Sequence, residues 1–145
     1  MFDTVVVATD GSESVSRAVD CTLDLARTFD ATVHALYVID ESRVDPLPEK
    51  LRDDVRGALD EQGVEAIDEI VDTNAECENP IRLETAVRAG RPEEQIVGYV
   101  RDIDADAVAM GTRGRSGEHS YLLGSVAERI VRTCPVPVLT VRQLE

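Results

Sequence analysis

The chain has 145 residues, of which 43% are hydrophobic and 3% aromatic, and it contains no Trp. This length is enough to bury a proper core, and we expect residues 1–145 to form a single domain. The formal net charge is −14, from 29 acidic and 15 basic residues. A field of that sign repels DNA, RNA and anionic membranes, so we expect neither nucleic acid nor a membrane as a partner.

The basic residues are almost all arginine, because Lys50 is the only lysine. A strongly acidic chain with so little lysine is typical of adaptation to high salt, where ions screen the self-repulsion. The alternative is an acidic protein from an ordinary GC-rich genome. We favour the halophilic interpretation.

Cysteine usage and the N-terminal sequence concern the cell compartment. Cys21, Cys77 and Cys134 are far apart and form no CxxC or Cys/His arrangement, which predicts a reducing cytosol without a disulfide framework or a zinc site. The start MFDTVVVATDG has no signal-peptide pattern, and no apolar run approaches membrane-spanning length. We therefore expect a cytoplasmic protein.

In chain order, the first predicted element is a buried strand, Thr4–Thr9, which is β-branched and ends in a turn. Asp10 or Ser12 is then suited to cap the following helix. That helix is predicted over Val15–Phe29, where apolar residues recur at helical spacing. A second strand follows over Thr32–Ile39 and is apolar on both faces.

Pro46 and Pro48 mark a loop before a long helix, Glu49–Cys77. Its predicted apolar stripe consists of Leu51, Val55, Leu59, Ala66, Ile67 and Ile70. Gly57 and Gly63 lie inside this helix, and each costs about 1 kcal/mol relative to Ala. We therefore expect a kink or a break there.

The next strand, Ile81–Arg88, alternates between apolar and polar residues, which indicates a place near the sheet margin. Gly90 then turns the chain, and Pro92 begins a helix whose inner face ends at Ile103. A fourth strand is predicted over Ala105–Met110.

A glycine-rich loop follows the fourth strand and leads into a helix that ends at about Thr133. The last strand is predicted over Val136–Val141. Because Pro137 cannot donate a ladder hydrogen bond, this strand is expected at an edge of the sheet or at a bulge.

The alternation of strands and helices predicts an α/β fold: a three-layer, Rossmann-like, open parallel sheet of five strands with helices on both faces. In such sheets ligands bind beyond the carboxyl ends of the strands, where the strand order reverses. The first and fourth strands end in the two turns that are most typical of a ligand site, at Asp10 and at Gly111.

The loop GTRGRSGEHSYLLGS, residues 111–125, has the composition of a phosphate cradle. Glycines let phosphate oxygens approach backbone N–H groups, and a helix N-terminus favours negative charge. Its place between a buried strand and a helix strengthens this interpretation. We predict a nucleotide-phosphate site here.

These residues resemble the universal stress protein family along essentially the whole chain, in VVVATDGSESVSRAV, LYVID, MGTRGRSG, LLGSVAERIV and CPVPVLTV. ATP-binding members carry Gly-x2-Gly-x9-Gly followed by Ser or Thr, and Gly111, Gly114, Gly124 and Ser125 match this pattern. The resemblance implies the ATP-binding subgroup, a strand order of 3-2-1-4-5, a role in stress response, and homodimers formed through Val136–Val141.

By the same resemblance, Asp10 would lie near the ribose and phosphates, and the backbone of Val38 would bind the adenine. The glycines, Ser125 and the amide of Val126 would hold the phosphates. The predicted nucleotide-binding residues are Thr9, Asp10, Val38, Met110, Gly111, Arg113, Gly114, Gly124, Ser125 and Val126. No protein side chain is predicted to bind metal directly, and Mg²⁺ would bind through the phosphates, near Asp10.

The chain departs from the family between Gly117 and Leu122, where many relatives carry basic residues and this chain has the sequence EHS. The loss weakens the expected hold on a polyphosphate or transfers it to Arg113, Arg115 or Mg²⁺. We interpret His34, inside a strand, as a structural histidine.

The leading functional hypothesis is a regulatory ATP-binding module with at most slow hydrolysis, because no lysine or transition-state arginine is evidently placed for phosphoryl transfer. The alternatives are a structural dimer that binds no nucleotide and a small adenine-nucleotide-dependent hydrolase. A phosphoacceptor receiver domain is excluded, since it needs a late lysine and Lys50 is the only one.

Overall fold

The computed structural model describes residues 2–12, 15–112 and 123–143. The strands are β1 (Thr4–Thr9), β2 (Thr32–Asp40), β3 (Leu83–Gly90), β4 (Ala107–Gly111) and β5 (Val138–Val141). The helices are α1 (Ser16–Phe29), α2 (Glu49–Glu76), α3 (Pro92–Asp102) and α4 (Ser125–Thr133), with a 3-10 turn η2 (Glu41–Arg43) after β2.

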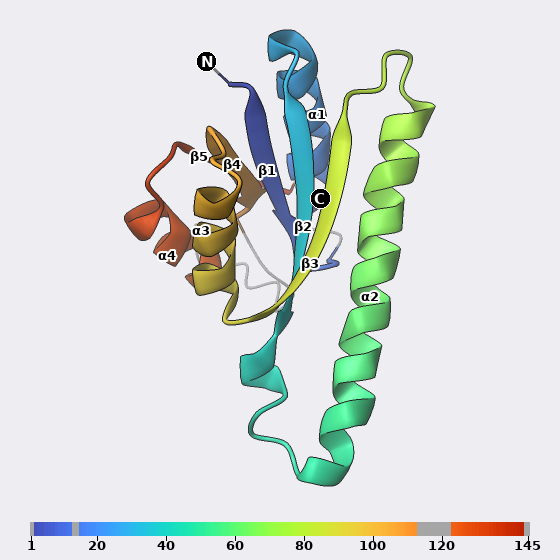
Figure 1. Ribbon diagram of the computed structural model, residues 1–145, viewed down its shortest axis with the longest axis vertical. Coiled ribbons are helices and arrows are strands. Elements are labelled where there is room, and N and C mark those ends of the chain that lie inside the picture. The colour runs from blue at the N-terminus through green and yellow to red at the C-terminus, as the bar shows by residue number, and fades with distance from the viewer. Residues whose placement is uncertain (1, 13–14, 113–122, 144–145) are drawn as a thin grey trace.

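The strands form one parallel sheet in the order β3-β2-β1-β4-β5, which confirms the predicted fold class and strand order. Helices α1 and α2 cover one face, and α3 and α4 cover the other (Figure 1). The edge positions predicted for the third and fifth strands are also confirmed.

Two apolar cores lie on the two faces of the sheet, and β1 contributes to both. Val5 and Val7 pack with residues of α1 and α2, whereas Val6 and Ala8 pack with residues of α3 and α4. Side chains alternate between faces along a strand, so a run that is apolar at every position is what a sheet covered on both faces requires. The turns at its carboxyl end are thus attached to a rigid strand.

The last three strands each begin two residues later than predicted, at Leu83, Ala107 and Val138. Side-chain hydrogen bonds occur just before two of these strands, β3 and β4. The backbone of Ile81 binds the side chain of Asn74, and the Asp106 carboxylate accepts hydrogen bonds from the N–H groups of residues 3 and 4 at 2.9 and 3.0 Å.

Helix α2 runs without a break from Glu49 to Glu76, so the predicted kink at Gly57 or Gly63 is wrong. Gly63 instead permits close packing, because a Cβ added there would overlap the Tyr37 ring of β2. Gly57 faces open space. The predicted stripe is correct from Val55 onward, with Val55 partly buried, but Leu51 is 48% exposed, because the first turns extend past the sheet (Figure 1).

The predicted cap of the first helix is also corrected. Helix α1 starts at Ser16 with Val15 in the N-cap position, so neither Asp10 nor Ser12 caps it. In α4 the N-cap position belongs to Gly124. Among the described helices, none is long and apolar enough to span a membrane.

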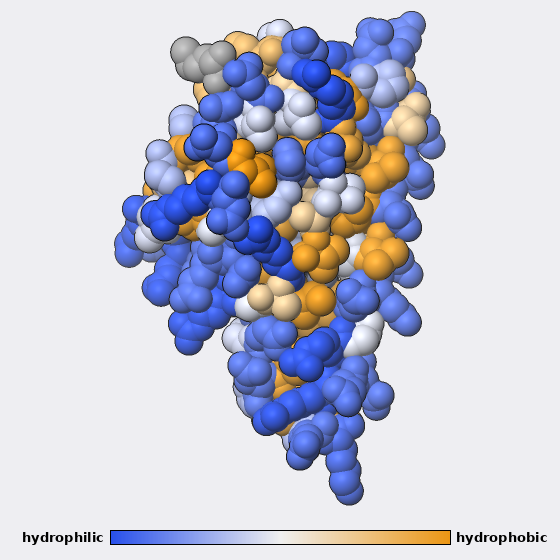
Figure 2. Space-filling view, in the orientation of Figure 1, coloured by the Kyte–Doolittle hydropathy of each residue, from blue (hydrophilic) through white to orange (hydrophobic). Residues whose placement is uncertain are grey.

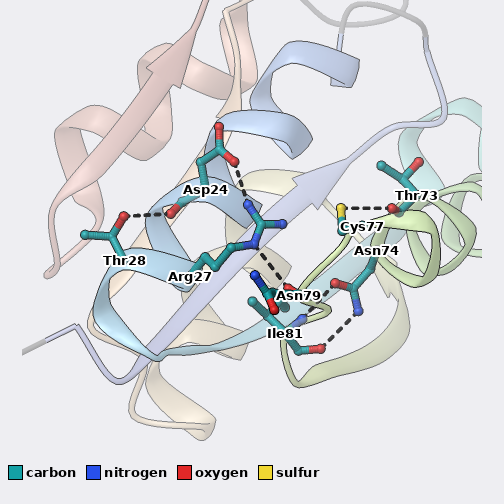
Figure 3. A network of polar contacts seen from close by, with 8 residues as sticks. All are labelled: Asp24, Arg27, Thr28, Thr73, Asn74, Cys77, Asn79 and Ile81. Atoms are coloured by element: carbon teal, nitrogen blue, oxygen red, sulfur yellow. Dashed lines mark hydrogen bonds and ion pairs between the residues drawn. The ribbon is translucent and has the colours of Figure 1, made fainter.

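Polar contacts fix the turn between α2 and β3, at the amino ends of the strands (Figure 3). The Asn74 side chain donates to the Ile81 carbonyl and accepts from the Ile81 N–H, both at 3.0 Å. Arg27 of α1 donates to the carbonyl of Asn79 at 3.1 Å and pairs with Asp24 at 2.7 Å. The start of β3 is therefore tied to both α1 and α2.

Candidate functional site

A cavity of about 540 Å³ lies at the carboxyl ends of β1, β2 and β4. Helix α4 and the start of α3 complete its walls. Its described lining residues are Ala8, Thr9, Asp10, Val15, Tyr37, Val38, Asp40, Arg43, Leu59, Pro92, Ile96, Met110, Gly111, Thr112, Gly124, Ser125, Val126 and Ala127. This is the position at which open parallel sheets bind ligands, because strand order reverses between β1 and β4.

Every predicted site residue that the structure describes lines this one cavity. These residues are Thr9, Asp10, Val38, Met110, Gly111, Gly124, Ser125 and Val126. Arg113 and Gly114 lie outside the described residues. The structure thus brings together the turn after the first strand, the end of the second and the start of the last helix.

The turn after β1 is shaped by its own side chains. Thr9 Oγ1 accepts a hydrogen bond from the Gly11 N–H at 3.1 Å, and Asp10 Oδ1 accepts from the Ser12 N–H at 2.9 Å. The Ser12 hydroxyl also donates to Asp10 Oδ1. Gly11 has a φ of 82°, which glycine adopts without strain. Together these bonds hold the Asp10 carboxylate at the cavity wall.

The turn after β2 repeats this arrangement and was missed by the sequence prediction. Asp40 Oδ1 accepts from the Ser42 N–H at 3.0 Å and from the Ser42 hydroxyl, and both Asp40 and Arg43 line the cavity. The signal was present in the sequence, since Asp-x-Ser follows both strands. Because β1 and β2 are parallel neighbours, the two turns that follow them lie at the same end of the sheet.

The apolar part of the cavity comes from elements that the sequence analysis treated only as core. Tyr37 of β2 is 2% exposed and lines the cavity together with Leu59 of α2 and Ile96 of α3. Pro92, at the first position of α3, also lines it. Such a wall suits a flat apolar ring system better than a charged group.

The wall formed by β4 and α4 has the opposite character. Gly124 donates its N–H to the Thr112 carbonyl, which brings the start of α4 beside the end of β4. A helix leaves its first N–H groups without intrahelical acceptors, and here those groups belong to the turn that starts at Ser125. Ser125 and Val126 both line the cavity, so this wall presents hydrogen-bond donors and the positive end of a helix dipole.

Charged lining residues are few among the described positions: the carboxylates Asp10 and Asp40 and the guanidinium of Arg43. Across the described residues there is no group of three or more His, Cys, Asp or Glu side chains arranged to hold a metal ion. His34 lies on β2 outside the lining, with Nδ1 2.9 Å from the Tyr99 hydroxyl. Burial lowers the pKa of His34, and Glu84 partly opposes that shift.

A doubly wound parallel sheet with a cavity at its switch point places the chain in the class of open α/β proteins. The sequence model described as "Universal stress protein family" matches residues 1–142. The chain belongs to the universal stress protein family, which confirms the predicted relationship.

The comparisons with individual proteins agree with that assignment. Universal stress protein MJ0531 of Methanocaldococcus jannaschii is 34% identical over 144 residues, which are 99% of this chain and 84% of that protein. The solved structure of hypothetical protein MJ0577 matches with a TM-score of 0.88 at 25% identity, covering 100% of this chain and 99% of its own. A crystal structure of a universal stress protein in complex with cAMP has a TM-score of 0.69 at 26% identity, with 97% of each chain covered.

Proposed function

We propose that this chain binds an adenine nucleotide, with ATP as its ligand, and acts as a regulatory module in the response to stress. The observation that carries the proposal is the convergence of the predicted residues of three separate segments on one cavity of nucleotide size, about 540 Å³. A relative of the same fold is described in complex with cAMP, which supports the adenine part of the proposal.

The two kinds of wall assign the parts of the nucleotide. The base lies between Tyr37, Leu59 and Ile96, and it is held by the backbone of Val38. The phosphates lie at the predicted glycine loop and the first turn of α4, and the leading N–H groups and dipole of that helix favour negative charge. Asp10, which directly follows the central strand β1 and lines the cavity, lies near the ribose and the phosphates and accepts hydrogen bonds from the ribose.

The residues present also fit Mg²⁺ bound through phosphates. Mg²⁺ usually keeps several waters and takes one or two carboxylates together with substrate phosphates. The cavity supplies one such carboxylate near the expected phosphate position, Asp10, held by the Ser12 N–H at 2.9 Å. When bound, Mg²⁺ would offset the repulsion between ATP and a chain of net charge −14.

We propose that any ATP hydrolysis is slow, below about one turnover per second. Rapid phosphoryl transfer uses a positioned Lys, a group that orients the attacking nucleophile and a transition-state arginine. Among the described lining residues the only basic group is Arg43, on the turn after β2 rather than beside the first turn of α4. A sensor that responds to nucleotide binding fits this arrangement better than an enzyme.

The cellular setting and assembly complete the proposal. We propose a cytoplasmic protein that forms homodimers by pairing the edge strand β5, within the predicted segment Val136–Val141. The support is topological, because β5 ends the sheet and offers backbone groups to a partner.

Titration calorimetry with ATP, AMP and GTP, in concentrated KCl and with Mg²⁺, tests the ligand. We expect ATP to bind with a Kd on the order of 10 µM. Gly114→Val should abolish this binding, because a side chain at this position of the predicted loop blocks the approach of the phosphates. Equal binding by both proteins, or none by the natural chain, would count against the cradle and favour the structural dimer.

Mass spectrometry of small molecules released from the purified protein, without added ligand, tests the proposal independently. We expect an adenine nucleotide in near-stoichiometric amount. Prolonged incubation with ATP distinguishes a switch from a hydrolase, since product formation faster than about one per second would contradict a regulatory role.

A further inference from the structure

The two edges of the sheet differ in their capacity to pair with another strand. β3 runs over eight residues, Leu83–Gly90, contains no Pro and pairs with β2 without interruption in register. β5 has four residues and follows Pro137 directly. Because a short edge strand next to Pro offers few backbone groups, β3 has more groups available for pairing than β5.

The register shows which backbone groups of β3 point away from the sheet. The Val33 N–H of β2 donates to the Arg82 carbonyl at 2.9 Å, and Val33 lies opposite Leu83. Residues that bond to one neighbour alternate along a strand, so the even-numbered residues of β3 bond to β2. The odd-numbered residues, among them Thr85 and Val87, direct their N–H and C=O groups to the open edge.

The same alternation divides the side chains of β3 between the two faces. Glu84, Ala86 and Arg88 share the face that α3 covers, since Ala86 packs into the core on that side. Thr85 and Val87 are on the α2 face, where Val87 is 45% exposed. Apolar side chains gather between β3 and α2 on the face shown in Figure 2.

We propose that β3 pairs with β3 of a second copy of this chain, antiparallel, about a two-fold axis at Ala86. In this register Glu84 lies opposite Arg88 of the second copy, and Arg88 lies opposite its Glu84. Both are non-hydrogen-bonded pairs, in which facing side chains come closest. Thr85 and Val87 form the hydrogen-bonded pairs, using the groups that the monomer directs outward. The occupant is thus specified by the complementarity of the strand with itself.

Charge excludes three neighbouring registers. An axis at Thr85 places Arg82 opposite Arg88 of the second copy. An axis at Glu84 or at Arg88 places that residue opposite itself. An axis at Val87 brings no opposite charges together, because Glu84 then faces Gly90. Like charges directly opposite each other destabilise a sheet, whereas opposite charges stabilise it, so the axis at Ala86 is preferred.

The edge is also held in place before it pairs. Arg88 forms an ion pair with Asp102 of α3 at 2.9 Å, and its guanidinium lies 4.7 Å from the centre of the Tyr99 ring. At the other end, the two hydrogen bonds between the Asn74 side chain and the Ile81 backbone fix Ile81 just before the strand. Ordering a strand in advance lowers the entropic cost of association.

This contact and the β5 contact proposed above use opposite edges and do not exclude each other. A chain that used both would assemble beyond a dimer. Molecular mass alone is therefore not diagnostic, and the test must report on the β3 register itself.

Disulfide trapping at neighbouring positions of β3 provides that report. In the proposed register residue 86 faces itself with Cα atoms about 4.5 Å apart, within the range of a disulfide. Residue 87 is displaced from its own copy by two positions, about 7–8 Å. We expect Ala86→Cys to form the intermolecular disulfide at least tenfold faster than Val87→Cys, although position 87 is the more exposed of the two. Peptide mapping identifies the bond.

Charge exchange tests the same register without relying on geometry alone. Glu84→Arg, introduced beside Ala86→Cys, should slow trapping roughly tenfold, because both cross-strand pairs become Arg–Arg. Adding Arg88→Glu should restore it by exchanging the two charges. Circular dichroism melting checks that each variant is folded.

Equal rates of disulfide formation at positions 86 and 87 would overturn the proposal. So would a rate at position 86 that stays the same after both charge changes. A dimer formed through β5 alone leaves both β3 positions unreacted, and the absence of trapping at position 86 would likewise overturn the proposal.

Discussion

The two ends of the sheet are built for different purposes, although they belong to the same strands. At the amino ends, side chains bind the backbone: Asn74 holds Ile81, and Asp106 holds the N–H groups of residues 3 and 4. At the carboxyl ends, the chain turns around a cavity of about 540 Å³. One end closes the fold, and the other lines a cavity with carboxylates and with the first turn of α4.

This division teaches that stability and ligand binding can be changed separately. A substitution at the amino ends removes hydrogen bonds that the fold needs and leaves the cavity wall untouched. A substitution of an exposed group at the carboxyl ends changes the cavity lining, where the nucleotide is proposed to bind, and costs the fold little. The expected effects below run from the largest to the smallest.

The largest effect is expected for Asn74→Ala. The change removes two hydrogen bonds and leaves the Ile81 N–H and C=O without these partners, which should destabilise the fold by about 2–3 kcal/mol. Urea unfolding measures this loss, and the affinity for ATP should stay within twofold. Asn79→Ala is the matched control, because Asn79 receives Arg27 through its backbone carbonyl and should change stability by less than about 0.5 kcal/mol. Equal losses in the two variants would contradict the role of the Asn74 side chain.

Ser125→Ala should show the opposite profile. Ser125 is exposed at the start of α4, so its removal should leave the melting temperature almost unchanged. A hydrogen bond to a charged phosphate contributes about 1.5–3 kcal/mol, so ATP affinity should fall at least tenfold. Ser125→Thr keeps the hydroxyl and should retain most of the affinity. A loss that is the same for adenosine as for ATP would mean that Ser125 does not contact phosphate.

The same division explains what could be predicted from the sequence. Strand runs, helix periodicity and the turns at Asp10 and Gly111 are local signals, and they gave the fold and one side of the cavity. The other side depends on packing between distant segments. Leu59 and Ile96 have the pattern of ordinary core residues, and nothing local shows that these parts of α2 and α3 meet a cavity. The turn at Asp40 is the one missed part of the site with a local signal, because its Asp-x-Ser sequence repeats the one at Asp10.

Gly63 and Gly57 show why the predicted break in α2 failed. Sequence propensity treats both glycines as weak points of a helix, but the structure gives them different surroundings.

Gly57→Ala places a methyl group in open space and should stabilise the protein by up to about 1 kcal/mol through helix propensity. In Gly63→Ala the new methyl group overlaps the Tyr37 ring. The cost of this overlap should exceed the gain in helix propensity, so the protein should be destabilised by about 1 kcal/mol in total. Because Tyr37 lines the cavity, ATP affinity should fall only in Gly63→Ala. Denaturation and titration of both variants check this, and equal stabilisation would exclude the close contact.

The smallest effect concerns His34, which lies between the two ends on β2 and contacts Tyr99 of α3 at 2.9 Å. Burial lowers its pKa in the folded protein below 6.5, the ordinary value, with Glu84 opposing the shift. Above pH 6.5 both folded and unfolded chains hold a neutral ring, so the group has no pH-dependent effect there. As the pH falls below 6.5, the unfolded chain binds a proton more readily than the folded one, and stability is lost until the pH passes the folded pKa.

His34→Gln keeps a hydrogen-bonding side chain that does not titrate. Its free energy of unfolding should therefore decline less than that of the natural chain between pH 7 and 5, while carboxylate effects are shared by both proteins. Parallel slopes would show that His34 titrates alike in the two states. A steeper decline in the variant would mean that the folded protein favours the charged ring, with Glu84 outweighing burial.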